Sequence, residues 1–246
     1  SIKERMINSI LIIGASSDIG IELIKNIDKD CLIIAHYNSS YGELKRLKSQ
    51  NNNIIPIKAN LMIESELNNL IEKVVKKIGV PEKIVHLAAT PVKQIRFNDV
   101  NWNNFEADIL ISLKSLVLIL RKFLPLMAAE KKGKVVIMLS SYVLGVPPIA
   151  LSHYTTTKYA LLGFMKSIAS EYKEKNIQIN AISPSLIETK FLENIHERSV
   201  ELSAYNHPLK RNAKVSDIVP VIELLLSKDS NYMNGTNIPI TGGSVF

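Results

Sequence analysis

Short runs rich in isoleucine and valine alternate along this 246-residue chain with longer segments that carry a helical apolar period. A strand that is apolar along its whole length is typical of a parallel sheet, because helices then cover both of its faces. The alternation predicts a doubly wound parallel sheet in one three-layer αβα domain spanning residues 1–246, with right-handed crossovers. The predicted strands are 9–13, 31–35, 53–58, 83–87, 133–139, 177–182 and 237–240, and the predicted helices are 19–27, 64–78, 101–127, 152–172 and 216–226.

Composition narrows the setting in which such a domain works. The single cysteine, Cys31, excludes an internal disulfide and fits a reducing, cytoplasmic location. No apolar run approaches the roughly 20 residues of a membrane span, and the charged residues 1–5 are unlike a signal peptide. We therefore expect a cytoplasmic protein with no membrane partner.

Lysine and arginine number 30 against 23 aspartates and glutamates, which gives a formal net charge of +7. A basic surface suits anionic ligands such as phosphates. The charges are scattered and only 6% of residues are aromatic, so we expect no nucleic-acid partner. The segment 190–214 is polar and rich in histidine and asparagine, and we expect it to be an irregular, mobile flap.

A glycine-rich turn follows the first predicted strand. Gly14 permits a tight turn, and Gly20 permits close packing of the next helix, whose N-terminus would face a pyrophosphate. This is the dinucleotide-binding arrangement of Rossmann-type sheets, although a purely structural turn is the alternative. We expect Ser16 and Ser17 to add hydroxyl donors. Asp18 would repel a pyrophosphate, so either it points away as a helix cap or it weakens the site.

The end of the second predicted strand bears on the choice of cofactor. An acidic residue there would bind a ribose 2′-hydroxyl and repel a 2′-phosphate. The segment 36–40 has no carboxylate and offers His36 as an imidazolium, together with the amide of Asn38 and the hydroxyl of Ser39. We therefore expect NADP(H) in preference to NAD(H).

Tyr154 and Lys158 lie four residues apart, one turn from each other on one face of a predicted helix. A neighbouring ammonium favours the ionised phenol and would lower the pKa of Tyr154, so that it could exchange a proton with a carbonyl or alcohol oxygen. An incidental surface pair is the alternative. His153 would face another side of the helix and lie at the rim of the site.

Five motifs in order carry a family resemblance: the glycine turn 13–20, Ser141, the Tyr154/Lys158 pair, the segment 184–189 and Thr241-Gly242-Gly243. The chain resembles the short-chain dehydrogenase/reductase superfamily, short single-domain branch. The resemblance implies an enzyme that transfers a hydride between NAD(P) and a ketone or secondary alcohol, with Tyr154 as general acid and base. It assigns Lys158 to the ribose hydroxyls and to tuning Tyr154, and Ser141, thirteen residues before Tyr154, to the substrate oxygen. Cofactor contacts are implied at Gly14, Ser16, Ser17, Asp18, Ile19, Gly20, His36, Asn38, Ser39, Asn60, Leu61, Ala88, Ala89, Tyr154, Lys158, Pro184, Ile187 and Thr189.

The chain departs from the family pattern at several of these positions. Asp18 replaces the middle glycine of the turn, and the family's Asn-Asn-Ala-Gly appears as residues 86–89, His-Leu-Ala-Ala. The aspartate that usually touches adenine falls at Asn60. Ser112 stands where a catalytic asparagine completes the family's proton relay, so the proton supply behind Lys158 is in question.

The resemblance leaves the substrate open within small carbonyl compounds and alcohols. A 3-oxoacyl-carrier-protein reductase and a keto-sugar or nucleotide-sugar reductase both fit, the latter because the flap carries His196, Arg198, His207, Lys210 and Arg211. The alternative function is a catalytically weak NADP(H)-binding sensor or scaffold. The family implies a homo-oligomer, a tetramer or dimer, with segments 113–126 and 160–172 as candidate interface helices. The alternative is that the apolar residues of these segments belong to the core of the monomer. No cluster of histidine, cysteine and acidic residues has metal-ligand spacing.

Overall fold

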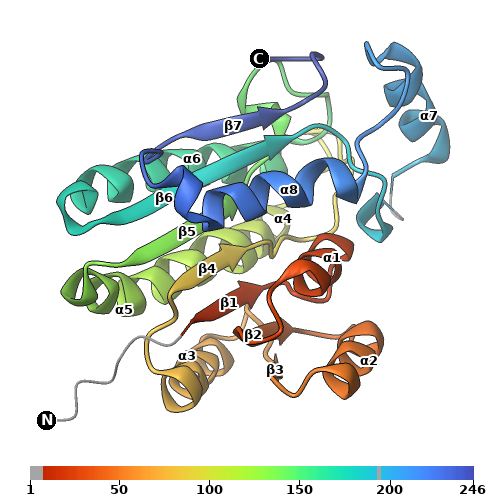
Figure 1. Cartoon of the computed structure of the whole chain (residues 1–246). Helices are drawn as coiled ribbons and strands as arrows, with labels where there is room; N and C mark the ends of the chain where they lie inside the picture. The colour runs from red at the N-terminus through yellow and green to blue at the C-terminus, as the bar shows by residue number, and fades with distance from the viewer. Residues whose placement is uncertain (1–7, 193–194) are drawn as a thin grey trace, which may run out of the picture.

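The structure, a computed structural model, describes residues 8–192 and 195–246, and shows one seven-stranded sheet flanked by helices (Figure 1). The charged residues 1–5 lie outside the described residues. The strands are β1 (Ser9–Ile13), β2 (Leu32–Tyr37), β3 (Ile54–Lys58), β4 (Lys83–His86), β5 (Gly133–Met138), β6 (Ile177–Pro184) and β7 (Asn237–Ile240). The α-helices are α1 (Asp18–Asn26), α2 (Gly42–Gln50), α3 (Glu64–Ile78), α4 (Trp102–Asp108), α5 (Ser115–Glu130), α6 (Ser152–Glu171), α7 (Glu197–Asn206) and α8 (Val215–Leu226).

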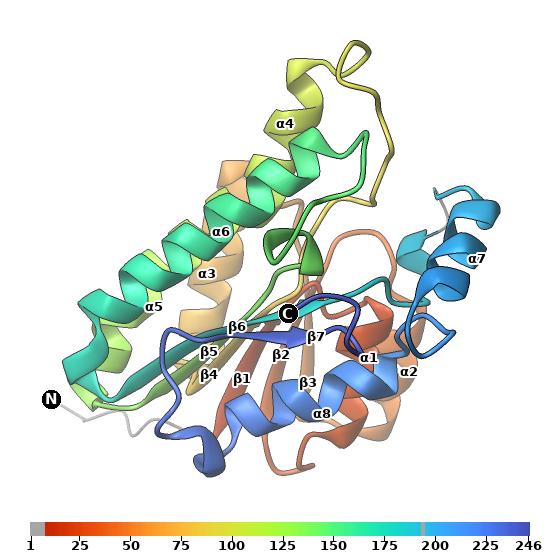
Figure 2. The ribbon, with the colours of Figure 1, turned by 90° about the horizontal axis from the view of Figure 1, so that it is seen from above.

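Three layers form because successive strand residues point to opposite faces of the sheet. In β1, Leu11 and Ile13 pack in the core beneath α3, α5 and α6, whereas Ile10 and Ile12 pack in the core beneath α1, α2 and α8. Figure 2 shows these two groups of helices on either side of the sheet. The doubly wound αβα architecture predicted from the sequence is confirmed.

The strands lie in the order β3-β2-β1-β4-β5-β6-β7, and all neighbouring strands are parallel. The strand order reverses at β1. Strands β2 and β3 lie on one side of β1, and β4, β5, β6 and β7 follow one another on its other side. The loops that leave the carboxyl ends of β1 and β4 therefore part at this point. Such a topological switch point is where open α/β sheets bind ligands.

Three segments differ from the sequence-based prediction. The predicted helix 101–127 is not continuous, because a π-helical stretch, η1 (Ile109–Lys114), separates α4 from α5. The polar helix α2 was not predicted, since it buries only Leu44 and Leu47. The prediction of an irregular flap at 190–214 was wrong for its middle, where α7 forms beyond the carboxyl ends of the strands (Figures 1 and 2).

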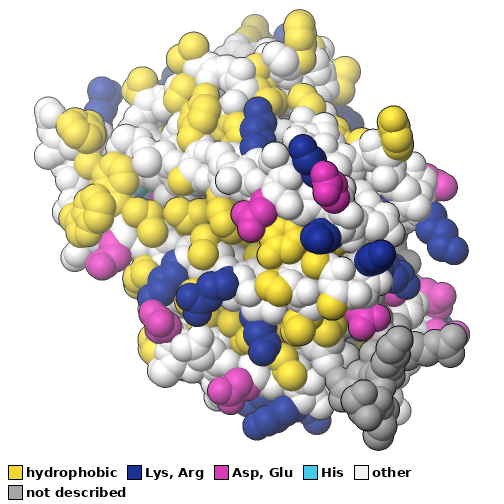
Figure 3. Space-filling view, turned by 90° about the vertical axis from the view of Figure 1, so that its left-hand side faces the viewer, with side chains coloured by type: hydrophobic (Ala, Val, Ile, Leu, Met, Phe, Trp, Pro, Cys, Tyr) yellow, Lys and Arg dark blue, Asp and Glu magenta, His cyan; other side chains and the backbone are white. Residues whose placement is uncertain are grey.

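The surface drawn in Figure 3 mixes its charges: lysine and arginine side chains lie among acidic and apolar ones. No basic stripe runs across this face. Among the described residues, no helix is long and apolar enough to cross a membrane.

The packing of α1 on the turn before it yields a stability prediction. A Cβ added at Gly20 would lie 2.5 Å from the backbone oxygen of Ala15, whereas a Cβ at Gly163, in the exposed interior of α6, would meet nothing within 4 Å. We expect Gly20→Ala to lower the free energy of unfolding by about 1–3 kcal/mol, because backbone must move. The control Gly163→Ala should raise it by about 0.5–1 kcal/mol. Urea denaturation of both variants measures this, and equal stability of the two would contradict the packing argument.

Candidate functional site

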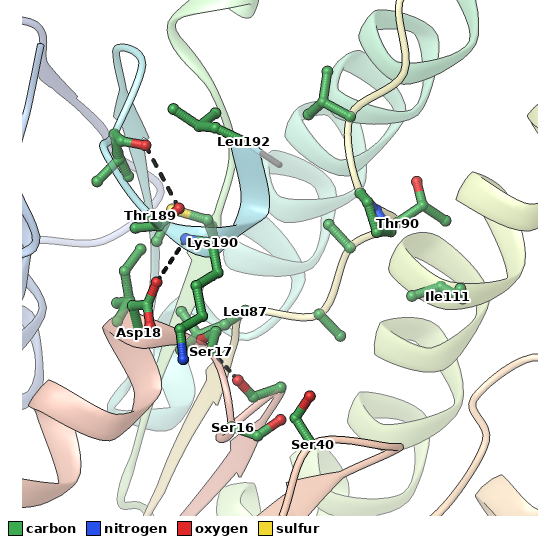
Figure 4. Close-up of a pocket in the computed structure, with 18 of the residues that line it drawn as sticks. Ser16, Ser17, Asp18, Ser40, Leu87, Thr90, Ile111, Thr189, Lys190 and Leu192 are labelled. Atoms are coloured by element: carbon green, nitrogen blue, oxygen red, sulfur yellow. Dashed lines mark hydrogen bonds between the residues drawn. The ribbon is translucent and has the colours of Figure 1, made fainter. Parts of the chain in front are cut away.

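A cavity of about 800 Å³ lies at the switch point, where the carboxyl ends of six strands converge. It extends from Asn38 and Ser39 after β2, past the glycine turn, to Tyr154 and Lys158 on α6 (Figure 4 shows part of it). Most residues that the sequence assigned to a cofactor line this cavity. Besides Tyr154 and Lys158, they are Gly14, Ser16, Ser17, Asp18, Ile19, His36, Asn38, Ser39, Asn60, Leu61, Ala88, Ala89, Pro184, Ile187 and Thr189.

The glycine turn fits a pyrophosphate. Gly14 has φ +80°, and a Cβ there would lie 2.9 Å from the backbone nitrogen of Ala88, so only glycine fits between the ends of β1 and β4. Gly20 does not line the cavity and instead permits the close packing of α1. The first turn of α1 leaves the N–H groups of Asp18 and Ile19 outside the helix's own hydrogen-bond ladder, and the helix dipole adds positive potential there.

The two serines of the turn have different roles. Ser17 is the N-cap of α1: its Oγ accepts from Gly20 N at 3.1 Å and donates to Gly14 O at 2.8 Å. The hydroxyl of Ser17 is therefore occupied within the turn, contrary to the expectation that it would be a phosphate donor. Ser16 lines the cavity and is the serine of the turn whose hydroxyl suits that role.

Asp18 turns away from the helix axis rather than capping α1. Its Oδ2 accepts from the backbone N–H of Lys190 at 2.8 Å, as Figure 4 shows. This bond joins the glycine turn to the segment after β6, so that Lys190 and Thr189 close one side of the cavity. The capping expectation was wrong because Ser17 already supplies the cap.

His36 is buried, and its two ring nitrogens have complementary partners. Nδ1 accepts from the N–H of Gly14 at 3.0 Å, and Nε2 donates to the carbonyl oxygen of Ala59 at 3.0 Å. These bonds require the neutral imidazole, and burial lowers the pKa of His36 in the same direction. The expected phosphate-binding imidazolium is therefore incorrect: His36 lines the cavity as a neutral bridge between strand ends.

A carboxylate that the sequence analysis missed lies near the end of β2. Glu43, in the first turn of α2, lines the cavity and receives two bonds from Arg46, at 2.9 and 3.2 Å. Hydrogen bonding to Arg46 lowers the pKa of Glu43. Glu43 lies beyond residues 36–40, on the next helix, so the sequence at the end of β2 did not indicate it.

Tyr154 and Lys158 are both buried and line the cavity together. The Nζ of Lys158 lies 5.4 Å from the centroid of the Tyr154 ring and donates to the carbonyl oxygen of Met138 at 3.0 Å. Burial lowers the pKa of Lys158 to about 8 and raises the pKa of Tyr154, while hydrogen bonding to Ser140 acts the other way on the tyrosine. The shift is opposite to the expected lowering of the phenol pKa, because burial disfavours the phenolate.

Of the adjacent residues Ser140 and Ser141, only Ser140 lines the same cavity as Tyr154. Ser140 lines the main cavity beside Tyr154, and its Oγ also accepts from the N–H of Tyr142 at 3.3 Å. Ser141 starts the 3₁₀ turn η2 (Ser141–Val143) and lies in the wall of a neighbouring cavity. Counting back from Tyr154 pointed to Ser141, but the end of β5 presents Ser140 to the cavity.

Ser112 is buried within the π-helical stretch η1 and does not line the cavity. Its Oγ donates to the carbonyl oxygen of Ala88 at 3.3 Å. Nearby, Ser115 donates to Ile111 O at 2.5 Å, so the Nε2–H of His86 must donate to Ser115 Oγ at 2.8 Å. Burial lowers the pKa of His86 to about 3, which keeps it neutral. These hydrogen bonds connect the end of β4 and the loop after it to η1 and to the start of α5.

A buried ionic cluster that the sequence analysis missed lies beside the cavity. Asp108 accepts from the Nδ1 of His153 at 2.6 Å and from the hydroxyl of Thr90, and the Nε2 of His153 donates to Lys93 O at 3.2 Å. Both ring nitrogens of His153 face acceptors only, which fits an imidazolium paired with the carboxylate. His153 is 4% exposed, so the expectation that it would be a rim residue was wrong. The cluster fixes the loop after β4 against α4 and α6.

Other predicted cofactor residues are held by local bonds. The Oδ1 of Asn60 accepts from Met62 N at 3.1 Å, and Asn60 N donates to Glu66 at 2.7 Å. The hydroxyl of Thr189 donates to Ile187 O at 3.5 Å. Within the described residues there is no group of three or more histidine, cysteine and acidic side chains that could hold a metal ion.

Several known sequences that resemble this chain are named as reductases. The profile described as enoyl-(acyl carrier protein) reductase matches residues 17–244. The chain is 29% identical over 193 residues to the 3-oxoacyl-(acyl-carrier-protein) reductase of Thermotoga maritima, covering 77% of this chain and 76% of that protein. The enzyme of the same name from Buchnera aphidicola is 27% identical over 238 residues, or 96% and 87% of the two chains.

Solved structures also resemble the fold. Levodione reductase superposes with a TM-score of 0.87 at 24% identity, over 97% of this chain and 98% of that one. ElxO with NADP bound superposes with a TM-score of 0.84 at 25% identity, with the same coverage of both chains. The first likeness extends to the fold alone, and the second is with a protein that binds NADP.

The buried ammonium of Lys158 makes a prediction about pH. Because its pKa of about 8 in the folded protein is below its ordinary value of 10.5, the folded state binds fewer protons than the unfolded state between these values. The lysine therefore destabilises the fold below pH 8, and this penalty disappears as the pH rises to 10.5. Lys158→Met should be more stable than the wild type at pH 7, by a margin that shrinks over this window. Urea denaturation of both proteins from pH 7 to 10.5 measures the margin.

The control for this experiment is Lys166→Met, which removes an exposed lysine of the same helix. Its stability difference from the wild type should not change with pH. A margin for Lys158→Met that is constant over the window would contradict the depressed pKa.

Proposed function

The chain belongs to the short-chain dehydrogenase/reductase superfamily and is an NAD(P)-dependent oxidoreductase of CH–OH and C=O groups, and on that premise we propose a specific reaction. The reaction interconverts a ketone and a secondary alcohol, with Tyr154 as the general acid and base. The observation that carries this proposal is the convergence of Tyr154, Lys158 and Ser140 on the cavity at the switch point. When bound, the nicotinamide supplies or accepts the hydride.

The protonation of Tyr154 supports its role in reduction. Because burial raises the pKa of Tyr154, the phenol keeps its proton near neutral pH and can donate it to the oxygen of a carbonyl group. The charge of Lys158, 5.4 Å from the ring centroid, would stabilise the phenolate that this step leaves. We assign the hydrogen bond to the substrate oxygen to Ser140 rather than Ser141, since Ser140 shares the cavity with Tyr154.

We propose NADP(H) as the cofactor. Asn38, Ser39 and Ser40 offer amide and hydroxyl donors to a 2′-phosphate, and Arg46 offsets the charge of Glu43. The likeness to ElxO, which binds NADP, supports the same choice. With His36 neutral, hydroxyl and amide groups would do most of this recognition.

Both substrate classes favoured by the sequence, acyl-carrier-protein thioesters and keto sugars, are compatible with this reaction. Relatives named 3-oxoacyl-(acyl-carrier-protein) reductase support the first. The alternative, an NADP(H)-binding sensor or scaffold, predicts binding of cofactor without turnover of any carbonyl compound. A homotetramer and a cytoplasmic location stay predictions.

Three variants test the catalytic assignment. Tyr154→Phe should lower kcat by about 10²-fold or more while leaving the Kd for NADPH within a few-fold, because it removes only the transferable proton. Ser140→Ala should lower kcat by about 10²–10³-fold through the lost hydrogen bond to the developing oxyanion. Ser141→Ala should lower kcat by less than about tenfold, since Ser141 lies outside the main cavity.

Steady-state oxidation of NADPH with a panel of ketones measures these effects. Near-normal turnover by Tyr154→Phe would overturn the reaction proposed. A larger loss in Ser141→Ala than in Ser140→Ala would overturn the choice of serine.

Cofactor preference is tested by fluorescence titration with NADPH and NADH. We expect NADPH to bind at least about tenfold more tightly, and Glu43→Gln to tighten NADPH further by removing a like charge near the 2′-phosphate. Tighter binding of NADH, weakened by Glu43→Gln, would show instead that Glu43 binds a ribose hydroxyl and that NAD(H) is the cofactor.

A further inference from the structure

A second cavity, of about 540 Å³, adjoins the cavity at the switch point, on the side of α7. The two share walls formed by Tyr142, Ser185, Leu186 and Ile195. Tyr142 also packs edge-on against Tyr154, with ring centroids 6.1 Å apart. If the carbonyl group of a compound reaches Tyr154, the remainder of the molecule would lie in this second cavity, which we call the substrate cavity.

Helix α7 forms part of the wall of the substrate cavity. Its polar side faces the cavity and its apolar side faces solvent, which is the reverse of an ordinary surface helix. Ser199, Ser203 and Asn206 line the cavity, whereas Leu202 is 56% and Tyr205 74% exposed to solvent. A helix that only covered a core would face its apolar side inward. The inner face of α7 instead presents hydroxyl and amide groups.

The other polar groups of the substrate cavity are also uncharged. Gln94, Ser185 and Ser244 line it, and no aspartate, glutamate, lysine or arginine does so among the described residues. His207 lines it as the neutral tautomer, because its Nε2 donates to Thr241 O at 2.8 Å and its Nδ1 accepts from Leu209 N at 3.1 Å. The described wall of the cavity therefore carries no formal charge.

Two of the flap cations that had favoured an anionic nucleotide sugar, Lys210 and Arg211, are engaged elsewhere. Lys210 donates to Tyr205 O at 3.0 Å, and Arg211 pairs with Asp217 at 2.6 Å. Neither lines the substrate cavity, and neither does Arg198. A phosphorylated substrate would find no compensating charge among these groups.

Apolar side chains complete the wall. Val146, Pro148, Leu151 and Ile195 line the cavity together with the serines. A long acyl chain would bury the hydroxyls without partners, which is costly, and a phosphate would enter without a counter-ion. A compound with hydroxyl groups on one edge and C–H groups on its face matches both kinds of wall.

On the basis of the proposed function, we infer that the substrate is a small, uncharged, polyhydroxylated carbonyl compound, of the chemical class of a ketose. Ser199 and Ser203 on α7 hydrogen-bond its hydroxyl groups. In the reductive direction, the carbonyl carbon gains the hydride from NADPH and its oxygen gains the proton of Tyr154, so that a polyol and NADP⁺ leave the site.

The test compares kcat/KM at saturating NADPH for four probes. L-erythrulose is the hydroxylated ketone, 2-butanone its counterpart with the same carbon skeleton, dihydroxyacetone phosphate the anionic probe and acetoacetyl-coenzyme A the acyl probe. We expect L-erythrulose to exceed each of the others by at least about 10²-fold, because a site built to bind hydroxyl groups rejects analogues that lack them. Calorimetric titration of L-erythrulose into the protein–NADP⁺ complex measures binding independently of turnover.

Variants on the two faces of α7 provide matched controls. Ser199→Ala/Ser203→Ala should raise the KM for L-erythrulose about tenfold or more and leave 2-butanone almost unaffected, since only the hydroxyl partners are lost. Leu202→Ala, on the exposed face of the same helix, should leave both unchanged.

The outcomes separate this inference from the proposed function. Preferred turnover of 2-butanone, dihydroxyacetone phosphate or acetoacetyl-coenzyme A would overturn the inference and support the proposed reaction. Failure of L-erythrulose to bind, or binding that does not depend on the two serines, would also overturn it. Serine-dependent binding of L-erythrulose without oxidation of NADPH by any probe would support the recognition of hydroxyl groups by α7, but it would overturn the proposed reaction and with it the role of a ketose as substrate.

Discussion

The neutral imidazole of His36 holds together the edge of the sheet on which the site is built. Through Gly14 N and Ala59 O it joins the loops that leave β1 and β3, and its own strand, β2, lies between them. A charged imidazolium could not accept from Gly14, so burial, which lowers the pKa of His36, also preserves the geometry of the glycine turn. A residue that the sequence offered as a ligand for phosphate is thus the support for the glycine turn.

A second set of buried polar groups supports the other half of the site. The Asp108–His153 pair fixes the loop after β4, and the Ser112–Ala88 bond ties that loop to η1. Both act close to Lys158, whose pKa burial lowers and the charge of Asp108 partly restores. Buried polar groups of this kind are stable only when their hydrogen bonds are satisfied, and the side chains of Asp108, His153 and Ser112 all have partners. The chain departs from its family at His86 and Ser112, yet both positions are bonded into the framework.

Much of the fold and of the lining of the cavity at the switch point was predictable, because both depend on local patterns. Continuous apolar strands determine a parallel sheet, and the residues after each strand necessarily gather at its carboxyl edge. Which of Ser140 and Ser141 lines the cavity with Tyr154 was not predictable by counting, since the connection to α6 can change by one residue without changing the fold. The π-helical stretch η1 and the exposed apolar face of α7 were missed for a similar reason: hydrophobic periodicity assumes that a helix is regular and packs its apolar side inward.

The sequence by itself determined the sheet, the glycine turn and the pairing of Tyr154 with Lys158, because each follows from spacing within a few residues or from the side-chain period of one element. Only the tertiary structure decided the charge of the buried side chains and their hydrogen-bond partners. His36 is neutral, burial raises the pKa of Tyr154, Asp18 binds Lys190 and Ser140 faces the cavity because of groups brought close from distant parts of the chain. Burial and hydrogen-bond partners set the charge of a side chain, and neither exists until the elements pack.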